Sequence, residues 1–66
     1  MQIKVENEND IIFEGDADDF LFENDSDMDL EIILNELEEK KVFTKMKALN
    51  LDGDTIIITK LPLYVD

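Results

Sequence analysis

The chain has 66 residues, of which 18 are Asp or Glu and six are Lys, so its net charge is −12 and its pI is near 4.1. It contains no His, Cys, Trp or Arg. These absences exclude a disulfide framework, thiolate or imidazole metal sites, and catalysis by a His base or a Cys nucleophile. The charge also argues against direct binding of DNA or RNA, because a phosphate backbone would be repelled. We therefore expect a binding protein with no enzymatic activity and no cofactor.

The apolar content favours a folded chain in spite of the charge. Ile, Leu, Val and Phe account for 23 of the 66 residues, well above the roughly 20 % below which disorder becomes the default. We expect a single domain over residues 1–66 of marginal stability, since chains of about 60 residues bury only roughly 60 % of their unfolded surface. The longest apolar runs have three residues and the N-terminus lacks signal-peptide features, so we expect a soluble cytoplasmic protein without a membrane span.

The first two predicted elements form a hairpin. Residues 2–6 and 10–14 are predicted to be strands, joined by the polar turn 7–9, because apolar and polar residues alternate in the first of them. The second strand is expected to end at Gly15. The inward-facing side chains are expected to be Ile3, Val5, Ile11 and Phe13. Next comes the acidic stretch 16–25, whose only large apolar residues, 20–22, are predicted to be a short third strand or an aromatic plug beneath a loop.

A helix is predicted over residues 27–41. Ser26 is the expected N-cap, because its hydroxyl can accept from the exposed amides of the first turn. Apolar residues at helical spacing form one stripe. They are Leu30, Ile33, Leu34 and Leu37. Met28 and Ile32 fall on the opposite side of this helix.

The remaining residues are predicted to form a second hairpin. Residues 43–51 and 54–61 are strand-like, and Asp52-Gly53 between them is typical of a two-residue type I′ turn. The residues expected to face each other are Leu49 with Ile56, and Ala48 with Ile57. The whole chain is therefore predicted to be an α+β domain, with one helix packed across a small antiparallel sheet, in the order β-β-(β)-α-β-β.

The charge is distributed unevenly along the chain. Residues 1–39 contain 15 acidic residues and one lysine, a net charge of −14, whereas residues 40–66 have a net charge of +2. The acidic part includes five residues spaced like the ligands of a calcium-binding EF-hand loop. They are Asp25, Asp27, Asp29, Glu31 and Glu36. The pattern fails at its sixth position, where Leu30 replaces the glycine that the loop requires. We therefore expect no metal site there.

Acidic side chains instead form rows around residues 6–10, 16–19 and 25–31. In its size, its acidity and these rows, the chain resembles the small acidic DNA-mimic inhibitors encoded by phages and mobile elements, which include anti-CRISPR and anti-restriction proteins. This resemblance involves no diagnostic motif. It implies an inhibitor that occupies the basic nucleic-acid-binding groove of a DNA-binding or DNA-cleaving protein, such as a nuclease or a CRISPR effector. The alternative is an acidic regulatory partner, antitoxin-like or a subunit that regulates transcription, which leaves nucleic-acid sites open.

Specific binding also needs apolar anchors beside the charge. The triplet 20–22 is one candidate, with burial in the core as its alternative role. Met28 and Ile32 are another, with packing beneath the 16–25 loop as the alternative. Either group is also a candidate contact for a homodimer, so a monomer and a homodimer both remain open. The residues expected to contact the partner are Glu6, Glu8, Asp10, Glu14, Asp16, Asp18, Asp19, Phe20, Phe22, Glu23, Asp25, Asp27, Asp29 and Glu31.

Overall fold

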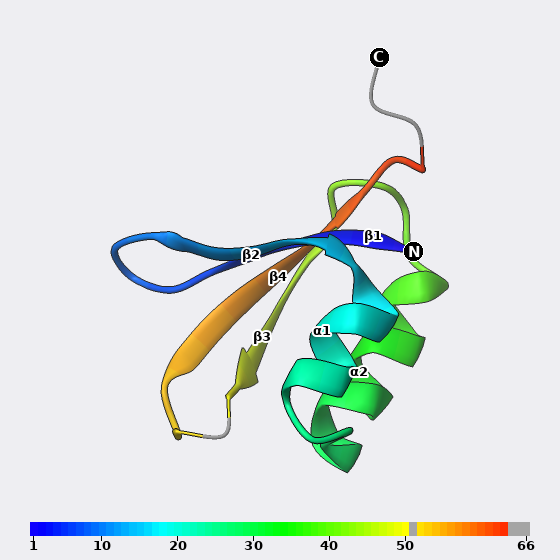
Figure 1. Ribbon diagram of the computed structural model, residues 1–66. Helices are drawn as coiled ribbons and strands as arrows, with labels where there is room; N and C mark the ends of the chain where they lie inside the picture. The colour runs from blue at the N-terminus through cyan, green and yellow to red at the C-terminus, as the bar shows by residue number, and fades with distance from the viewer. Residues whose placement is uncertain (51, 64–66) are drawn as a thin grey trace.

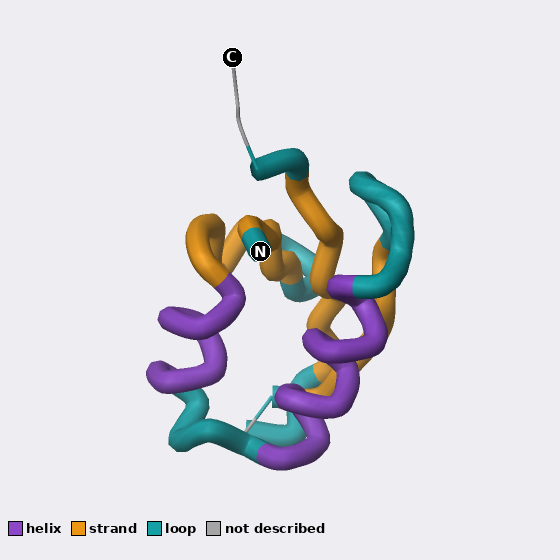
Figure 2. Tube along the Cα trace, turned by 90° about the vertical axis from the view of Figure 1, so that its right-hand side faces the viewer, coloured by secondary structure: helices purple, strands orange, loops and turns teal. Residues whose placement is uncertain are grey.

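The computed structural model describes residues 1–50 and 52–63 and shows a four-stranded antiparallel sheet with two helices on one side (Figures 1 and 2). In chain order the elements are β1 (Gln2–Glu6), β2 (Ile11–Asp16), α1 (Ala17–Glu23), α2 (Met28–Glu38), β3 (Lys45–Leu49) and β4 (Thr55–Leu61). The strand order is β2-β1-β4-β3, so the first and last strands pair at the centre and β2 and β3 form the edges. The predicted α+β class and antiparallel sheet are confirmed.

The core lies between the helices and one face of the sheet. The predicted stripe of α2 is confirmed, because Leu30, Leu34 and Leu37 are buried and Ile33 packs against them half-buried. The sheet contributes four wholly buried side chains. They are Ile3, Val5, Ile56 and Ile58. Burying each such side chain contributes about 1.5–3 kcal/mol, which is how so small and so charged a chain can hold a fold.

Helix α1 replaces the short third strand that the sequence suggested for residues 20–22. Asp16 is its N-cap, and the Oδ1 of Asp16 accepts from the backbone N of Asp18 at 2.8 Å. Ala17 and Phe20, three residues apart, are both buried, which is helical spacing. The strand prediction was wrong because a run of three apolar residues reads the same way in either element.

The three apolar residues of α1 have different environments. Phe20 is buried and its ring lies 5.1 Å from that of Phe13, centroid to centroid, so the plug interpretation holds for this residue. Leu21 is half-buried, whereas Phe22 is 81 % exposed.

Helix α2 is shorter than predicted at its C-terminal end, and its N-cap is Asp27 rather than Ser26. Asp25 and Ser26 have φ angles of 56° and 52°, so they form a left-handed turn between the helices, and Ser26 cannot adopt the extended cap conformation. The Oδ1 of Asp27 accepts from the backbone N of Asp29 at 2.8 Å and of Leu30 at 3.3 Å. The helix ends at Glu38, before Lys40 and Lys41.

Strand β2 continues through Gly15 to Asp16, one residue beyond the predicted end. The predicted inward position of Ile11 was wrong, because this side chain is 56 % exposed. A register shift between Val5 and Glu6 opposite β2 changes the alternation of inward and outward side chains in β2. Phe13 therefore packs against the core, whereas Ile11 does not.

The β3–β4 hairpin also has a different register from the prediction. Ala48 pairs with Ile56 and Leu49 pairs with Thr55, so each residue of β3 pairs with a β4 residue one position earlier in the sequence than predicted. The expected two-residue turn is replaced by a longer connection, because Asn50 holds it: the backbone N of Asn50 donates to Asp54 O, and Asn50 Oδ1 accepts from Asp54 N at 2.9 Å. Leu51, the last residue of the predicted strand, lies outside the described residues.

Strand β3 begins at Lys45 rather than at residue 43. Phe43 has a φ angle of 70°, in the left-handed region that strands do not use. Its backbone N donates to Lys60 O at 2.7 Å, which holds the residue against the end of β4.

Candidate protein-interaction surface

The acidic charge is concentrated in the helical layer, by which we mean residues 17–39. This layer contains ten acidic residues and no basic residue. They are Asp18, Asp19, Glu23, Asp25, Asp27, Asp29, Glu31, Glu36, Glu38 and Glu39. All are exposed except Asp27, which is half-buried. The four strands, in contrast, hold three acidic residues and four lysines. Because both helices lie on one side of the sheet (Figure 1), the molecule has one strongly negative side.

The outer face of α2 combines this charge with apolar side chains. Met28 and Ile32 are 75 % and 60 % exposed, so the predicted alternative, packing beneath the 16–25 segment, does not account for them. At about 100° per residue they form a ridge on the side away from the core. Two acidic rows flank the ridge, and in each row the residues lie seven positions apart. The rows are Glu31 with Glu38, and Asp29 with Glu36.

The density of charge along α2 is close to that of a nucleic-acid strand. From Asp27 to Glu39 the helix and its caps contain six acidic residues. At about 1.5 Å of rise per residue they cover roughly 18 Å, or about 3 Å of axis per charge. One strand of DNA carries a charge about every 3.4 Å. The helix therefore presents negative charge at a density close to that of one DNA strand, although the charges are distributed around the helix.

Several predicted contact residues lie away from the helical layer. In the sheet register Glu14 pairs with Lys4, Gln2 pairs with Asp16, and Glu6 follows Lys4 by two residues, so these acids share the open face opposite the helices. Lys45 and Lys47 lie on the same face through their pairing with β4. The structure does not join the three predicted acidic rows into one surface.

Two further groups of predicted acids are distinguished by their position or their hydrogen bonds, and Asp16 belongs to the second of them as well as to the open face. Glu8 and Asp10 lie at the tip of the β1–β2 hairpin, far from the helices in Figure 1. Asp16 and Asp27 cap the two helices, so their carboxylates already accept backbone hydrogen bonds. The helical layer also contains three acids that were absent from the predicted set, Glu36, Glu38 and Glu39. The signal for them was the acidic run 36–39, which only Leu37 interrupts.

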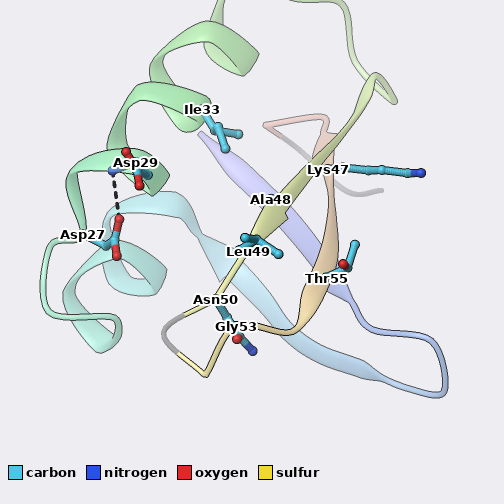
Figure 3. Close-up of a pocket in the computed structure, with 9 residues that line it drawn as sticks. All are labelled: Asp27, Asp29, Ile33, Lys47, Ala48, Leu49, Asn50, Gly53 and Thr55. Atoms are coloured by element: carbon cyan, nitrogen blue, oxygen red, sulfur yellow. Dashed lines mark hydrogen bonds between the residues drawn. The ribbon is translucent and has the colours of Figure 1, made fainter.

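A groove of about 610 Å³, which was not predicted from the sequence, separates the start of α2 from β3 (Figure 3). One side is formed by Asp27, Asp29 and Ile33 of the helix and its cap. The other side is formed by residues of β3 and of the following turn. They are Lys47, Ala48, Leu49, Asn50 and Gly53, together with Thr55 of β4.

Among residues 1–50 and 52–63, no three acidic side chains converge on a point where a metal ion would be held. No helix in the described part of the chain has the length and apolarity needed to cross a membrane. No family model, curated protein or solved structure matches the chain.

Proposed function

We propose that this protein is an acidic inhibitor that occupies the basic nucleic-acid-binding groove of a DNA-binding or DNA-cleaving protein, such as a nuclease or a CRISPR effector. The observation that carries the proposal is the helical layer, in which ten acidic residues are accompanied by no basic residue. Solubility requires only a modest net charge of mixed sign, so such a one-sided surface needs another reason. A groove that binds DNA is lined with Lys and Arg for phosphates, and an acidic layer of similar charge density can take their place.

The mechanism follows from electrostatics and exclusion. Attraction between the acidic layer and a basic groove accelerates encounter and weakens as salt is added. Once the helical layer is docked, the lysines and arginines that would contact phosphates are covered, so DNA cannot enter. Met28 and Ile32 supply the apolar contacts that desolvated interface centres need.

A second function is favoured by the same apolar ridge. The exposed Met28 and Ile32 side chains do not require a nucleic-acid groove, because apolar anchors can contact a partner beside its DNA site as well as within it. The ridge between acidic rows is equally suited to a second role, in which this protein is itself an acidic regulatory partner. It would then be antitoxin-like or a transcription-regulating subunit, and it would bind a basic protein beside the nucleic-acid site of that protein. The two functions differ in whether DNA and this protein exclude each other.

Competition on the partner tests the proposal. The protein is immobilised, bacterial lysate is applied, and partners are eluted with a salt gradient. The purified partner is then titrated with labelled DNA in the presence and absence of this protein. Mutual exclusion and a steep loss of affinity with salt are expected for an inhibitor of the DNA site. A ternary complex of partner, DNA and this protein would contradict it and would favour the regulatory function.

Matched triple variants locate the binding surface. The first neutralises three exposed acids of α2, Glu31→Gln, Glu36→Gln and Glu38→Gln. The control neutralises three exposed acids elsewhere, Glu8→Gln, Asp10→Asn and Asp52→Asn. Both change the net charge equally. We expect the first to weaken partner binding about tenfold or more and the control to have a smaller effect, since each ion pair contributes roughly 0.2–1 kcal/mol. Equal losses would show that overall charge, not the helical layer, is recognised.

A further inference from the structure

The groove between α2 and β3 runs along the edge of the sheet. Four consecutive residues, 47–50, line it. Successive strand side chains point to opposite faces, so consecutive residues can share one groove only where it follows the strand's free edge. Strand β3 is an edge strand, with β4 on its other side. The groove therefore opens onto the side of β3 that has no neighbouring strand among residues 1–50 and 52–63.

Backbone groups of β3 point into this groove. The backbone N of Lys60 donates to Thr44 O, and the backbone N of Asn50 donates to Asp54 O, so residues 44 and 50 bond toward β4. In an antiparallel pair this direction alternates, which assigns Met46 and Ala48 to β4 as well. The N–H and C=O groups of the intervening residues face the free edge. They are Lys45, Lys47 and Leu49.

The side chains around the groove favour a basic occupant with aliphatic character. Ile33 is half-buried, buried Ala48 is the apolar residue of the strand on the helix side, and exposed Leu49 lines the groove from the open side of the edge. Figure 3 shows the carboxylates of Asp27 and Asp29 together on the helix side of the groove. The carboxylate of Asp29 is exposed and is free to accept from a cation, whereas that of Asp27 is committed in part to capping. An arginine or lysine matches both features, since its stem is apolar and its end is charged.

We propose that this groove binds an extended segment of a basic partner protein, which adds to β3 as a fifth strand and places an arginine or lysine stem over Ile33 with its charge at Asp29. Addition of a strand to an exposed sheet edge is a common mode of peptide recognition, in which main-chain hydrogen bonds give affinity and side-chain sites give specificity. The proposed function supplies the basic character of the partner. The groove specifies its conformation.

A second copy of this chain does not fit the same edge. Antiparallel pairing of two β3 strands would bring Lys45 and Lys47 of one copy against the same lysines of the other. Lysine on an edge strand opposes such pairing, and like charges directly opposite are destabilising. The edge therefore discriminates against self-association while remaining open to a strand with a suitable charge pattern.

Titration of the ¹⁵N-labelled protein with a short peptide tests the inference. The probe is acetyl-Thr-Arg-Thr-Arg-Thr-amide, followed by amide chemical shifts at high salt. The control peptide carries N-methyl groups on the amides of one edge, which keeps its charge and removes its donors. We expect the largest shifts at Lys47 and Leu49 and at least tenfold weaker binding of the methylated peptide. Equal binding of the two peptides, or shifts spread over the helical layer, would overturn the inference.

Two single variants supply the electrostatic arm of the test. Asp29→Asn removes the groove carboxylate, and Glu36→Gln removes another exposed carboxylate of the same helix outside the groove. We expect Asp29→Asn to weaken the probe roughly three- to fivefold more than Glu36→Gln. Equal effects would refute recognition in the groove. If the two variants have equal effects but this protein still competes with DNA, only the groove inference is rejected and the proposed function remains. If the probe binds in the groove but this protein does not compete with DNA, only the proposed function is rejected.

Discussion

Lys60 of β4 closes the C-terminal end of α2, and removing its ammonium group is expected to destabilise the fold measurably. Its Nζ donates to the carbonyl oxygens of Glu38 at 2.6 Å and Lys40 at 2.7 Å. Lys60 pairs with Ile3, on the helix-covered face of the sheet, so its stem runs beneath the helix end. The side chain satisfies carbonyls that have no helical partner and places a positive charge at the negative end of the helix dipole.

The test variant is Lys60→Met, which keeps the length of the stem and removes only the charged donor. Two charge-assisted hydrogen bonds with a helix end are expected to contribute about 1 kcal/mol, because the groups are partly exposed to solvent. For a domain of this size that loss lowers Tm by roughly 4–8 °C. Thermal unfolding followed by circular dichroism measures the shift.

The matched control is Lys41→Met, which changes the net charge equally. Within residues 1–50 and 52–63 the side chain of Lys41 makes no hydrogen bond or ion pair. We expect Lys41→Met to lower Tm far less than Lys60→Met, and added salt to narrow the difference by screening the dipole. Equal shifts for the two variants would refute the capping role and leave only the change in overall charge.

Two further stability changes follow from the structure. Phe43 has a left-handed backbone with φ of 70°, which costs a non-glycine residue roughly 1–2 kcal/mol. Phe43→Gly should therefore be more stable than Phe43→Ala by about 1 kcal/mol in denaturant titrations. The opposite order of stability would contradict the presence of backbone strain. Thr59 is buried, and its hydroxyl has no hydrogen-bond partner among the described residues. Thr59→Val should therefore stabilise the fold by about 1 kcal/mol, while Thr55→Val at an exposed position should change the stability little. A loss of stability in Thr59→Val would show that the hydroxyl has a hydrogen-bond partner.

The strongly periodic parts of the chain were predictable from the sequence. Leu30, Leu34 and Leu37 repeat over three turns of helix, and Ile3 and Val5 alternate with polar residues, so both signals are long enough to define an element. Helix α1 has only seven residues, and its apolar triplet suits either element type. Asp16 followed by acids in the first turn, with Ala17 and Phe20 three residues apart, was the available signal for it.

Turns and boundaries depended on interactions that a linear pattern does not show. Asp52-Gly53 favours a tight turn, but the hydrogen bonds of Asn50 to Asp54 compete with it and shift the register by one residue. The end of α2 is fixed by Lys60, which is distant in sequence. The unequal charge of the two parts of the chain was visible at once. The groove depends on the packing of α2 beside β3 and could not be anticipated.

The separation of the acidic helical layer from the lysines of the sheet also makes the molecule a large electric dipole. Such a molecule experiences a torque in the field of a basic partner and turns its helices toward it before contact. Most protein pairs associate slowly because few random encounters have the correct orientation. With the basic partner that we propose, orientation and approach would be driven by the same field, so the fraction of productive encounters should rise together with their frequency. The polarity of the fold is thus a kinetic property as well as a chemical one.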